Sequence, residues 1–205
     1  MKIGDRPGPP EVRTARPAEW LVIGELLGDA FQDDPLWAWM APDPRRRQLH
    51  LGSLFAQVVK PLVGAGHAHT NEDRSGAAVW APPNGWKTSN REAIPLAVPF
   101  MRAAGLSHLK ASLAAIDRME QLHPDEPHWY LAVIGSDPQV RAGGFGHALM
   151  RSRLDRCDAE YAPAYLESSN PDNIGYYQRF CYEVTGEITL PDGGPVMYPM
   201  WRNPR

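Results

Sequence analysis

The stretch of sequence that decides the fold is Arg141-Ala142-Gly143-Gly144-Phe145-Gly146-His147. It lies between an apolar run of strand type, residues 129–134, and a segment with helical apolar spacing, residues 150–161. Its backbone amides are therefore expected to point into a concavity at a helix N-terminus, where free N–H groups and the helix dipole favour phosphate. Its three glycines permit a sharp bend and leave room for close approach. The sequence predicts a phosphate-binding turn.

Two common phosphate loops do not fit this turn. A Walker-type loop requires Gly-Lys-Ser/Thr, but Gly146 is followed by His147. A dinucleotide fingerprint requires a third glycine at position 149, which is Leu149. What remains is the pattern Arg-x-x-Gly-x-Gly, formed by Arg141, Gly144 and Gly146. Taken alone, this pattern also fits a helix cap with spare glycines.

The pattern is similar to the acyl-CoA pyrophosphate signature of the GNAT acetyltransferases, and residues 128–183 resemble the GNAT core throughout. Asn170 stands seven residues before Tyr177, as in the Asn–x6–Tyr element of that family. One departure is Cys181-Tyr182, where the family has Gly-Phe, and it makes the end of the preceding helix less comfortable. A closer resemblance, over about 55 residues, is to the puromycin N-acetyltransferase-like actinobacterial proteins.

The resemblance implies an α/β fold of GNAT type, in which two central strands of a mixed sheet splay apart and helices flank the sheet. It also implies acetyl-CoA as cosubstrate, with no metal. The pantetheine arm is then expected to pair with the backbone of Ile134, Gly135 and Ser136. The pyrophosphate is expected at the turn formed by Arg141, Ala142, Gly143, Gly144, Phe145, Gly146 and His147.

Acetyl transfer to an amine requires a group that removes a proton from the ammonium and a group that protonates the leaving thiolate. By the resemblance, Tyr177 is the predicted general acid, and its alternative role is to anchor a helix on the sheet. Glu167 is the predicted base or partner of the substrate ammonium, and its alternative is a solvated carboxylate at a strand end. His128 is a candidate member of a proton relay.

Two further groups of residues have open alternatives. Asn170 and Asn173 either bond the pantetheine amides or cap the helix after Pro171. Three tryptophans, Trp37, Trp39 and Trp86, flank the segments that form the acceptor pocket in similar proteins, and they either line that pocket or pack in the core.

The apolar periodicity and the turn signals predict the elements of the chain. Helices are expected from residue 17 to 31, 45 to 63, 89 to 122 with a break near Gly105, 145 to 161 and 173 to 180. Strands are expected at residues 11–15, 67–71, 76–80, 129–134, 164–167, 183–190 and 195–201. The segment 32–35, which contains Asp34-Pro35, is expected to end the first helix.

The composition of the 205 residues limits the function classes. A formal net charge of −3 argues against a nucleic-acid partner, and no apolar run is long enough for a membrane span. Two cysteines give neither a metal pattern nor a disulfide framework, and the first residues lack the apolar run of a signal peptide, so a cytoplasmic protein is expected. Residues 1–10 are expected to form a flexible tail and residues 11–205 a single domain, monomeric or homodimeric.

These observations predict an acetyl-CoA-dependent N-acetyltransferase that modifies a small-molecule amine, such as an antibiotic or another secondary metabolite. Two alternatives remain open at this point. One is acetylation of a protein N-terminus or lysine, and the other is a non-catalytic acyl-CoA-binding sensor.

Overall fold

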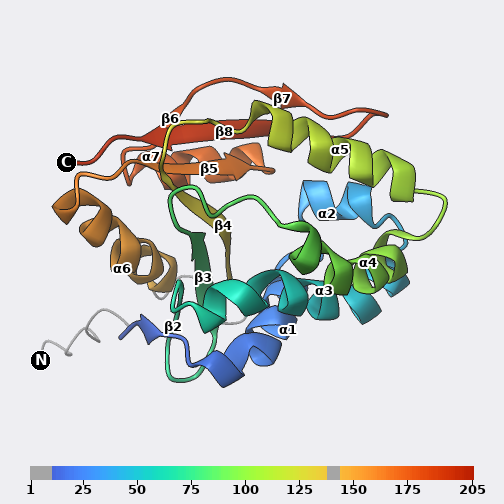
Figure 1. The fold of residues 1–205 in the computed structure, drawn as a ribbon, viewed down its shortest axis with the longest axis horizontal. Coiled ribbons are helices and arrows are strands. Elements are labelled where there is room, and N and C mark those ends of the chain that lie inside the picture. The colour runs from blue at the N-terminus through green and yellow to red at the C-terminus, as the bar shows by residue number, and fades with distance from the viewer. Residues whose placement is uncertain (1–10, 138–143) are drawn as a thin grey trace, which may run out of the picture.

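A computed structural model describes residues 11–137 and 144–205, except the side chains of Asn90 and Glu92. Its centre is an eight-stranded mixed sheet in the order β1-β2-β3-β4-β5-β8-β6, with β7 paired to β8 (Figure 1). Only the β4–β5 pair is parallel among the pairs of this sheet within the described residues. The strands are β1 Arg13–Thr14, β2 Ala68–Thr70, β3 Gly76–Ala81, β4 Trp129–Ser136, β5 Ala164–Ser168, β6 Glu183–Val184, β7 Ile188–Thr189 and β8 Val196–Arg202.

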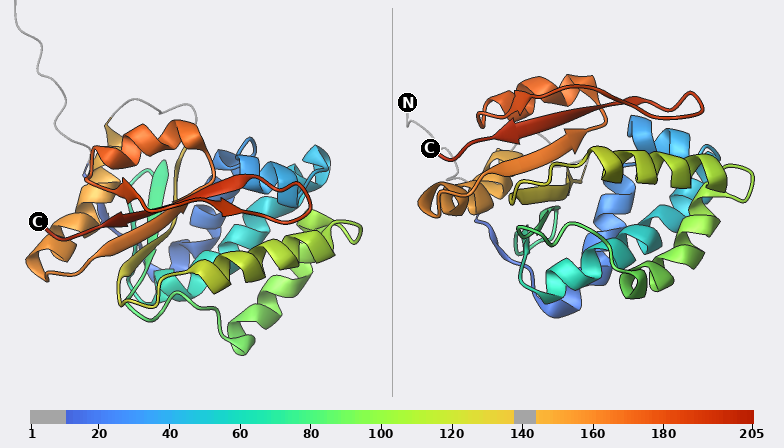
Figure 2. Two further views of the ribbon diagram at one scale, coloured as in Figure 1. Left: turned by 90° about the horizontal axis from the view of Figure 1, so that it is seen from above. Right: turned by 45° about the horizontal axis from the view of Figure 1, so that its top comes forward.

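Helices cover both faces of the sheet. They are η1 Pro17–Glu19, α1 Trp20–Ala30, α2 Pro35–Met40, α3 Pro44–Gly64, α4 Asn90–Ala104, α5 Leu109–Leu122, α6 Phe145–Ala159, η3 Pro171–Asn173 and α7 Ile174–Gln178. Helix α6 lies on one side of β3 and β4, whereas α1 and α3 lie on the other (Figure 1). Helix α5 runs alongside the β7–β8 hairpin and packs on it (Figure 2).

The alternation of side chains along β3 joins the two cores. Ala78 and Trp80 pack with α6, and Ala77 and Val79 pack with α1 and α3. All four residues are fully buried. A strand buried on both faces reads as a continuous apolar run, and successive side chains enter opposite layers.

The two central strands separate after a short paired region. Strands β4 and β5 pair only at Trp129↔Ala164 and Tyr130↔Tyr165 within the described residues, although β4 continues to Ser136. Beyond this fork the β5 side of β4 has no strand partner, which leaves backbone groups free for a ligand. The predicted mixed sheet with splayed central strands is confirmed.

The first helix ends at Ala30, just before the segment 32–35, as predicted. The same segment also starts α2, a helix that was not predicted, because Asp34 caps it and Pro35 occupies its first turn. The Asp34 carboxylate accepts the Leu36 and Trp37 N–H groups at 3.0 and 3.2 Å. The single strand expected at residues 183–190 is divided into β6 and β7.

The departure from the family pattern at Cys181 has a visible consequence. Cys181 follows α7 with a φ of 69°, a left-handed conformation in which glycine avoids the steric penalty of a Cβ. The prediction that this helix end is less favourable than it would be with glycine is confirmed.

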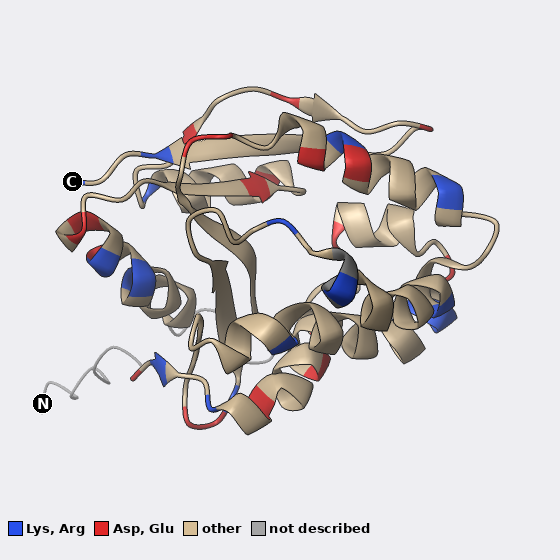
Figure 3. Cartoon of the chain, viewed as in Figure 1, with Lys and Arg blue, Asp and Glu red and all other residues tan. Residues whose placement is uncertain are grey.

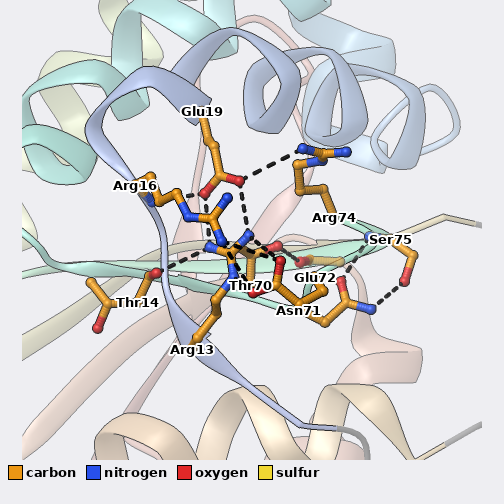
Figure 4. A network of polar contacts seen from close by, with 10 residues as sticks. Arg13, Thr14, Arg16, Glu19, Thr70, Asn71, Glu72, Arg74 and Ser75 are labelled. Carbon is orange, nitrogen blue, oxygen red and sulfur yellow. Dashed lines mark hydrogen bonds and ion pairs between the residues drawn. The ribbon is translucent and has the colours of Figure 1, made fainter.

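A polar network fixes the first strand to the sheet edge (Figure 4). The Arg13 guanidinium donates two hydrogen bonds of 2.8 Å to Glu19 and one of 2.5 Å to Glu72. The hydrogen bonds from Arg13 lower the pKa of Glu19 to about 2. The network joins η1 to the β2–β3 turn and therefore locates the start of α1.

Candidate active site

A cavity of about 560 Å³ opens beside the β4–β5 fork. Its walls come from the end of α1 and the turn after it, the end of β4, the start of α6, and the segment from Asn170 to α7. Four chain segments that are distant in the sequence therefore meet at the point where the sheet opens.

The end of β4 forms one wall of the cavity. Ile134, Gly135 and Ser136 line it, as predicted for residues that bind the pantetheine arm. A Cβ atom on Gly135 would lie 3.0 Å from side-chain atoms of Leu27 and Ala30. Glycine at this position therefore lets α1 pack directly against the strand, which brings the end of α1 to the cavity.

The glycine turn enters the cavity through Gly146, which lines it in the first turn of α6. A Cβ atom on Gly146 would lie 2.8 Å from the Tyr176 hydroxyl oxygen, so the absence of a side chain is required there. Gly144 caps α6 with a φ of 75°, a conformation that favours glycine. Three residues of the predicted pyrophosphate turn, Arg141, Ala142 and Gly143, lie outside the described residues.

The structure places Phe145 and His147 away from the cavity lining. Phe145 is buried in the core with α6 and β3. His147 is exposed, and its ring centroid lies 5.0 Å from that of Phe180.

Tyr177 lines the cavity with only 9% of its surface exposed. Burial raises its pKa above the ordinary value of 10. The hydroxyl group therefore stays protonated at neutral pH and can act as a proton donor. The neighbouring Tyr176 also lines the cavity, and burial raises its pKa to about 12.

The two predicted asparagines both reach the cavity. The Asn170 side chain accepts the Asp172 N–H at 2.9 Å and caps η3, so its predicted capping role is confirmed. Asn173 makes no capping hydrogen bond with its side chain. Its side-chain amide remains available to a ligand in the cavity.

Asp34 is a cavity residue that the sequence analysis missed. The Ser169 hydroxyl donates to its Oδ2 atom, while its Oδ1 atom caps α2. Burial raises the pKa of this carboxyl group above the ordinary value. The available signal was the pair Asp34-Pro35 before an apolar run, which is a pattern for a helix start as well as for a helix end.

Glu167 lies at the fork but is not part of the cavity lining. Its side chain is 1% exposed, so the alternative of a solvated strand-end carboxylate was wrong. The Tyr130 hydroxyl donates to Glu167 Oε2 at 2.7 Å, and His123 Nδ1 lies 3.3 Å from Oε1. The Nε2 atoms of His123 and His128 lie 3.0 Å apart, so a chain of contacts joins His128 to Glu167.

The three predicted acceptor-pocket tryptophans do not line the cavity. Trp37 packs on Phe55 with ring centroids 5.0 Å apart, and Trp39 packs edge-on against His108 at 4.9 Å. Trp86 stacks on His123 at 3.7 Å. Trp37 packs against the core of α1 and α3, and Trp39 packs against the core of α5 and β7.

Comparisons with known proteins identify the fold. No known protein-family model matches the sequence. A solved structure from Corynebacterium glutamicum, described as histone acetyltransferase HPA2 and related acetyltransferase, superposes with a TM-score of 0.69. The two sequences are 26% identical, and the match covers 96% of this chain and 97% of the other. This chain has the GNAT acetyltransferase fold.

Two other relatives agree with the GNAT fold. An uncharacterized N-acetyltransferase of Schizosaccharomyces pombe is 24% identical over 174 residues, which span 80% of this chain and 70% of the relative. The structure of an agmatine N-acetyltransferase mutant matches with a TM-score of 0.64 at 17% identity, covering 94% of this chain and 98% of the other.

The cavity fits the cosubstrate that GNAT acetyltransferases use, acetyl-CoA. The unpaired side of β4, the amide groups at the start of α6 and the asparagine side chains offer hydrogen bonds along one wall. Among the described residues, no group of three or more His, Cys, Asp or Glu side chains is arranged to hold a metal ion. No helix in the described ranges is long and apolar enough to cross a membrane.

Acidic and basic residues both occur along the described helices and loops, and Figure 3 shows their positions interspersed along the chain. A large basic face is the feature by which nucleic-acid-binding proteins attract phosphates.

Proposed function

We propose that this protein transfers an acetyl group from acetyl-CoA to the primary amine of a small molecule by direct attack on the thioester. The observation that carries the proposal is that the Asp34 carboxylate and the Tyr177 hydroxyl line one cavity at the β4–β5 fork. Acetyl-CoA supplies an activated acetyl thioester. The protein then has to bind it, accept one proton and donate another.

Backbone groups of Ile134, Gly135 and Ser136 are proposed to hold the pantetheine arm. Amide groups at the start of α6, next to Gly146, are proposed to receive the pyrophosphate, since a helix N-terminus attracts anions. A backbone N–H of β4 near Gly135 is proposed to stabilise the negative charge that develops on the thioester oxygen. Arg141, Ala142 and Gly143, which lie outside the described residues, complete the proposed pyrophosphate site.

Asp34 is our proposed base. An alkyl ammonium group has a pKa of about 10 and must lose a proton before its nitrogen can attack. The raised pKa of Asp34 makes it a better proton acceptor than an ordinary aspartate, and hydrogen bonds from Ser169 and α2 hold it in place. Glu167 is the second candidate for the base, because it lies just beyond the last β4–β5 pair.

Tyr177 is our proposed acid. As the C–S bond breaks, the sulfur receives the bonding electrons, and the Tyr177 hydroxyl donates its proton to the thiolate. The first proton that the amine loses remains on the base until solvent removes it. As the amide forms, the nitrogen loses its second proton, which returns through solvent to the Tyr177 phenolate. In each turnover two protons thus leave the nitrogen, one ends on the CoA thiol and one goes to solvent.

Two of the similar structures support the proposed acceptor class. One is an agmatine N-acetyltransferase, and another is a Drosophila melanogaster polyamine N-acetyltransferase, at 18% identity and a TM-score of 0.59. Small amines are therefore the proposed acceptors, with antibiotics and other secondary metabolites as the narrower proposal. Trp37, Trp39 and Trp86 are proposed to shape the acceptor side through the elements they pack.

A protein acceptor is the second candidate, favoured by the name of the structure from Corynebacterium glutamicum. A thiol-release assay with small amines on one side and basic peptides on the other separates the two candidates. A non-catalytic acyl-CoA sensor would instead be stabilised by acetyl-CoA and release no thiol with either class.

The substitution Tyr177→Phe tests the proposal. It removes the proton donor and keeps the ring, so turnover is expected to fall by about 10²-fold while the affinity for acetyl-CoA changes little. Thiol release measures turnover, and calorimetry with CoA measures affinity. The matched control is Tyr161→Phe, since Tyr161 is 83% exposed and lies outside the cavity. Equal turnover in Tyr177→Phe and in the control would remove Tyr177 from the mechanism.

A further inference from the structure

The end of α1 brings an unbalanced negative charge to the cavity. Asp29, Asp33 and Asp34 all line it. Among the described residues, no lysine, arginine or histidine lines the same cavity. The part of the cavity lined by the end of α1 and the turn after it therefore attracts cations.

The position of these carboxylates on α1 is unfavourable for the helix itself. The C-terminal end of a helix carries partial negative charge, so basic residues are the ones that stabilise it. Helix α1 has no basic residue in its last turn and has Asp29 there, with Asp33 in the turn that follows. A positively charged ligand would relieve this repulsion.

A basic side chain close to the α1–α2 turn does not neutralise the carboxylates. Arg47 donates hydrogen bonds of 2.7 Å to the backbone carbonyls of Gln32 and Ala41 instead. Within the described ranges, no ion pair joins Asp29 or Asp33 to a basic side chain, and both residues are exposed.

Tyr177 provides an independent sign that a ligand binds here. It is nine-tenths buried and lines the same cavity. No hydrogen bond to its hydroxyl group occurs within residues 11–137 and 144–205. A hydroxyl that faces a cavity without a protein partner is available to a ligand or to water.

The three carboxylates divide into two kinds. Asp34 accepts hydrogen bonds from Ser169 and from N–H groups of α2. It lines the same cavity as Tyr177. Asp29 and Asp33 make no such contacts with described residues and are open to solvent. One carboxylate is thus fixed for the reacting amine, and two are free to bind another positive group.

We propose that the acceptor carries two positive charges, as in a diamine or an amine with a guanidinium group, and that Asp29 and Asp33 bind the charge remote from the reacting nitrogen. This inference rests on the proposed acetyltransferase function. The distal cation, paired with two exposed carboxylates, orients the reacting amine toward Asp34 and Tyr177. Asp29 and Asp33 are specificity-determining residues in this scheme.

The test compares two acceptors of equal length, 1,4-diaminobutane and 4-amino-1-butanol, which has a hydroxyl in place of the second ammonium. The wild-type protein is expected to have the higher kcat/KM for the diamine. The variant Asp29→Asn/Asp33→Asn is expected to lose about tenfold of that preference, because each exposed ion pair contributes a few-fold. The loss is expected in KM rather than in kcat.

The matched control is Asp73→Asn/Glu183→Gln, which removes two exposed carboxylates outside the cavity. It is expected to keep the wild-type preference. Equal use of both acceptors by the wild-type protein, or an unchanged preference in Asp29→Asn/Asp33→Asn, would overturn the inference.

A binding measurement separates this inference from the proposed function. Calorimetry with 1,4-diaminobutane and CoA, which has no acetyl group to transfer, reports acceptor binding without turnover. Diamine binding that is lost in Asp29→Asn/Asp33→Asn supports the inference even if no amine is acetylated, in which case the proposed function alone fails. Absence of diamine binding to the wild-type protein overturns the inference, whatever monoamine the protein acetylates.

Discussion

Two regions at the β4–β5 fork pair a carboxylate with a tyrosine, and they differ in what those groups contact. On one side, the Tyr130 hydroxyl donates to Glu167 at 2.7 Å, and the Glu167 side chain is 1% exposed. On the other side, Asp34 and Tyr177 line the cavity, and the Tyr177 hydroxyl has no hydrogen bond within the described part of the chain.

The difference shows that the β4–β5 fork holds both a structural contact and a candidate active site. Tyr130 and Glu167 hydrogen-bond to each other away from solvent and contribute to holding the strands, because burial of a polar group costs least when it is hydrogen-bonded. Groups left facing a cavity keep their hydrogen-bonding capacity for a ligand. Accessibility, rather than residue type, separates Asp34 from Glu167.

The largest expected effect comes from Asp34→Asn. Removal of the proposed base is expected to lower kcat by about 10²- to 10⁴-fold in the thiol-release assay. The fold should not suffer, since asparagine is also a good N-cap for α2. Because the pKa of Asp34 is raised in the folded protein, its charged form destabilises the fold at neutral pH. The Asp34→Asn variant should therefore unfold at the same temperature as the wild-type protein or at a higher one.

The proposed role of Asp34 as the base also predicts how the activity of the wild-type protein depends on pH. A base must be ionised, and the pKa of Asp34 is raised, so activity is expected to fall at a higher pH than for an ordinary aspartate as the solution is acidified. A kcat in Asp34→Asn close to that of the wild type would place the base elsewhere, with Glu167 as the next residue to examine.

The second effect is one of stability, in Glu167→Gln. Loss of this buried carboxylate leaves His123 without its charged partner, and the free energy of unfolding is expected to fall by about 3 kcal/mol. Denaturant unfolding measures the change. Turnover per folded molecule is expected to fall by less than about tenfold, a smaller loss than removal of a general base produces. A stable Glu167→Gln variant with little turnover would reverse the roles assigned to the two carboxylates.

The smallest effect is expected in Ser169→Ala. The Ser169 hydroxyl donates to Asp34, and this hydrogen bond lowers the pKa of Asp34 against the larger effect of burial. Its loss should move the acidic limb of the kcat/KM profile to higher pH and leave the plateau nearly unchanged. A neutral control is Ser53→Ala, whose hydroxyl bonds only a backbone carbonyl within α3. An unmoved limb in Ser169→Ala would argue that Asp34 is not the group that titrates.

Much of the fold could be predicted from local patterns. The apolar spacing in residues 20–30 and 45–63 gave α1 and α3 within about two residues, because an amphipathic helix repeats its buried face every 3.6 residues. The start of a second helix at the Asp34-Pro35 pair was missed, since the same dipeptide ends one helix and begins another when the intervening turn is only a few residues long. Missing it also hid the best candidate for the base.

By itself, the sequence determined the fold class and pointed to the segments that line one part of the cavity, the end of β4 and the start of α6. The glycine turn and the strand before it are contiguous in the sequence. Their backbone conformation depends mainly on their own residues and is therefore readable from the sequence. Only the tertiary structure decided which carboxylate is open and which is sealed. Asp34 and Ser169 are 135 residues apart and meet across the fork, and Glu167 meets His123 and Tyr130 from other elements. Burial and pKa depend on such distant neighbours, which no local pattern specifies.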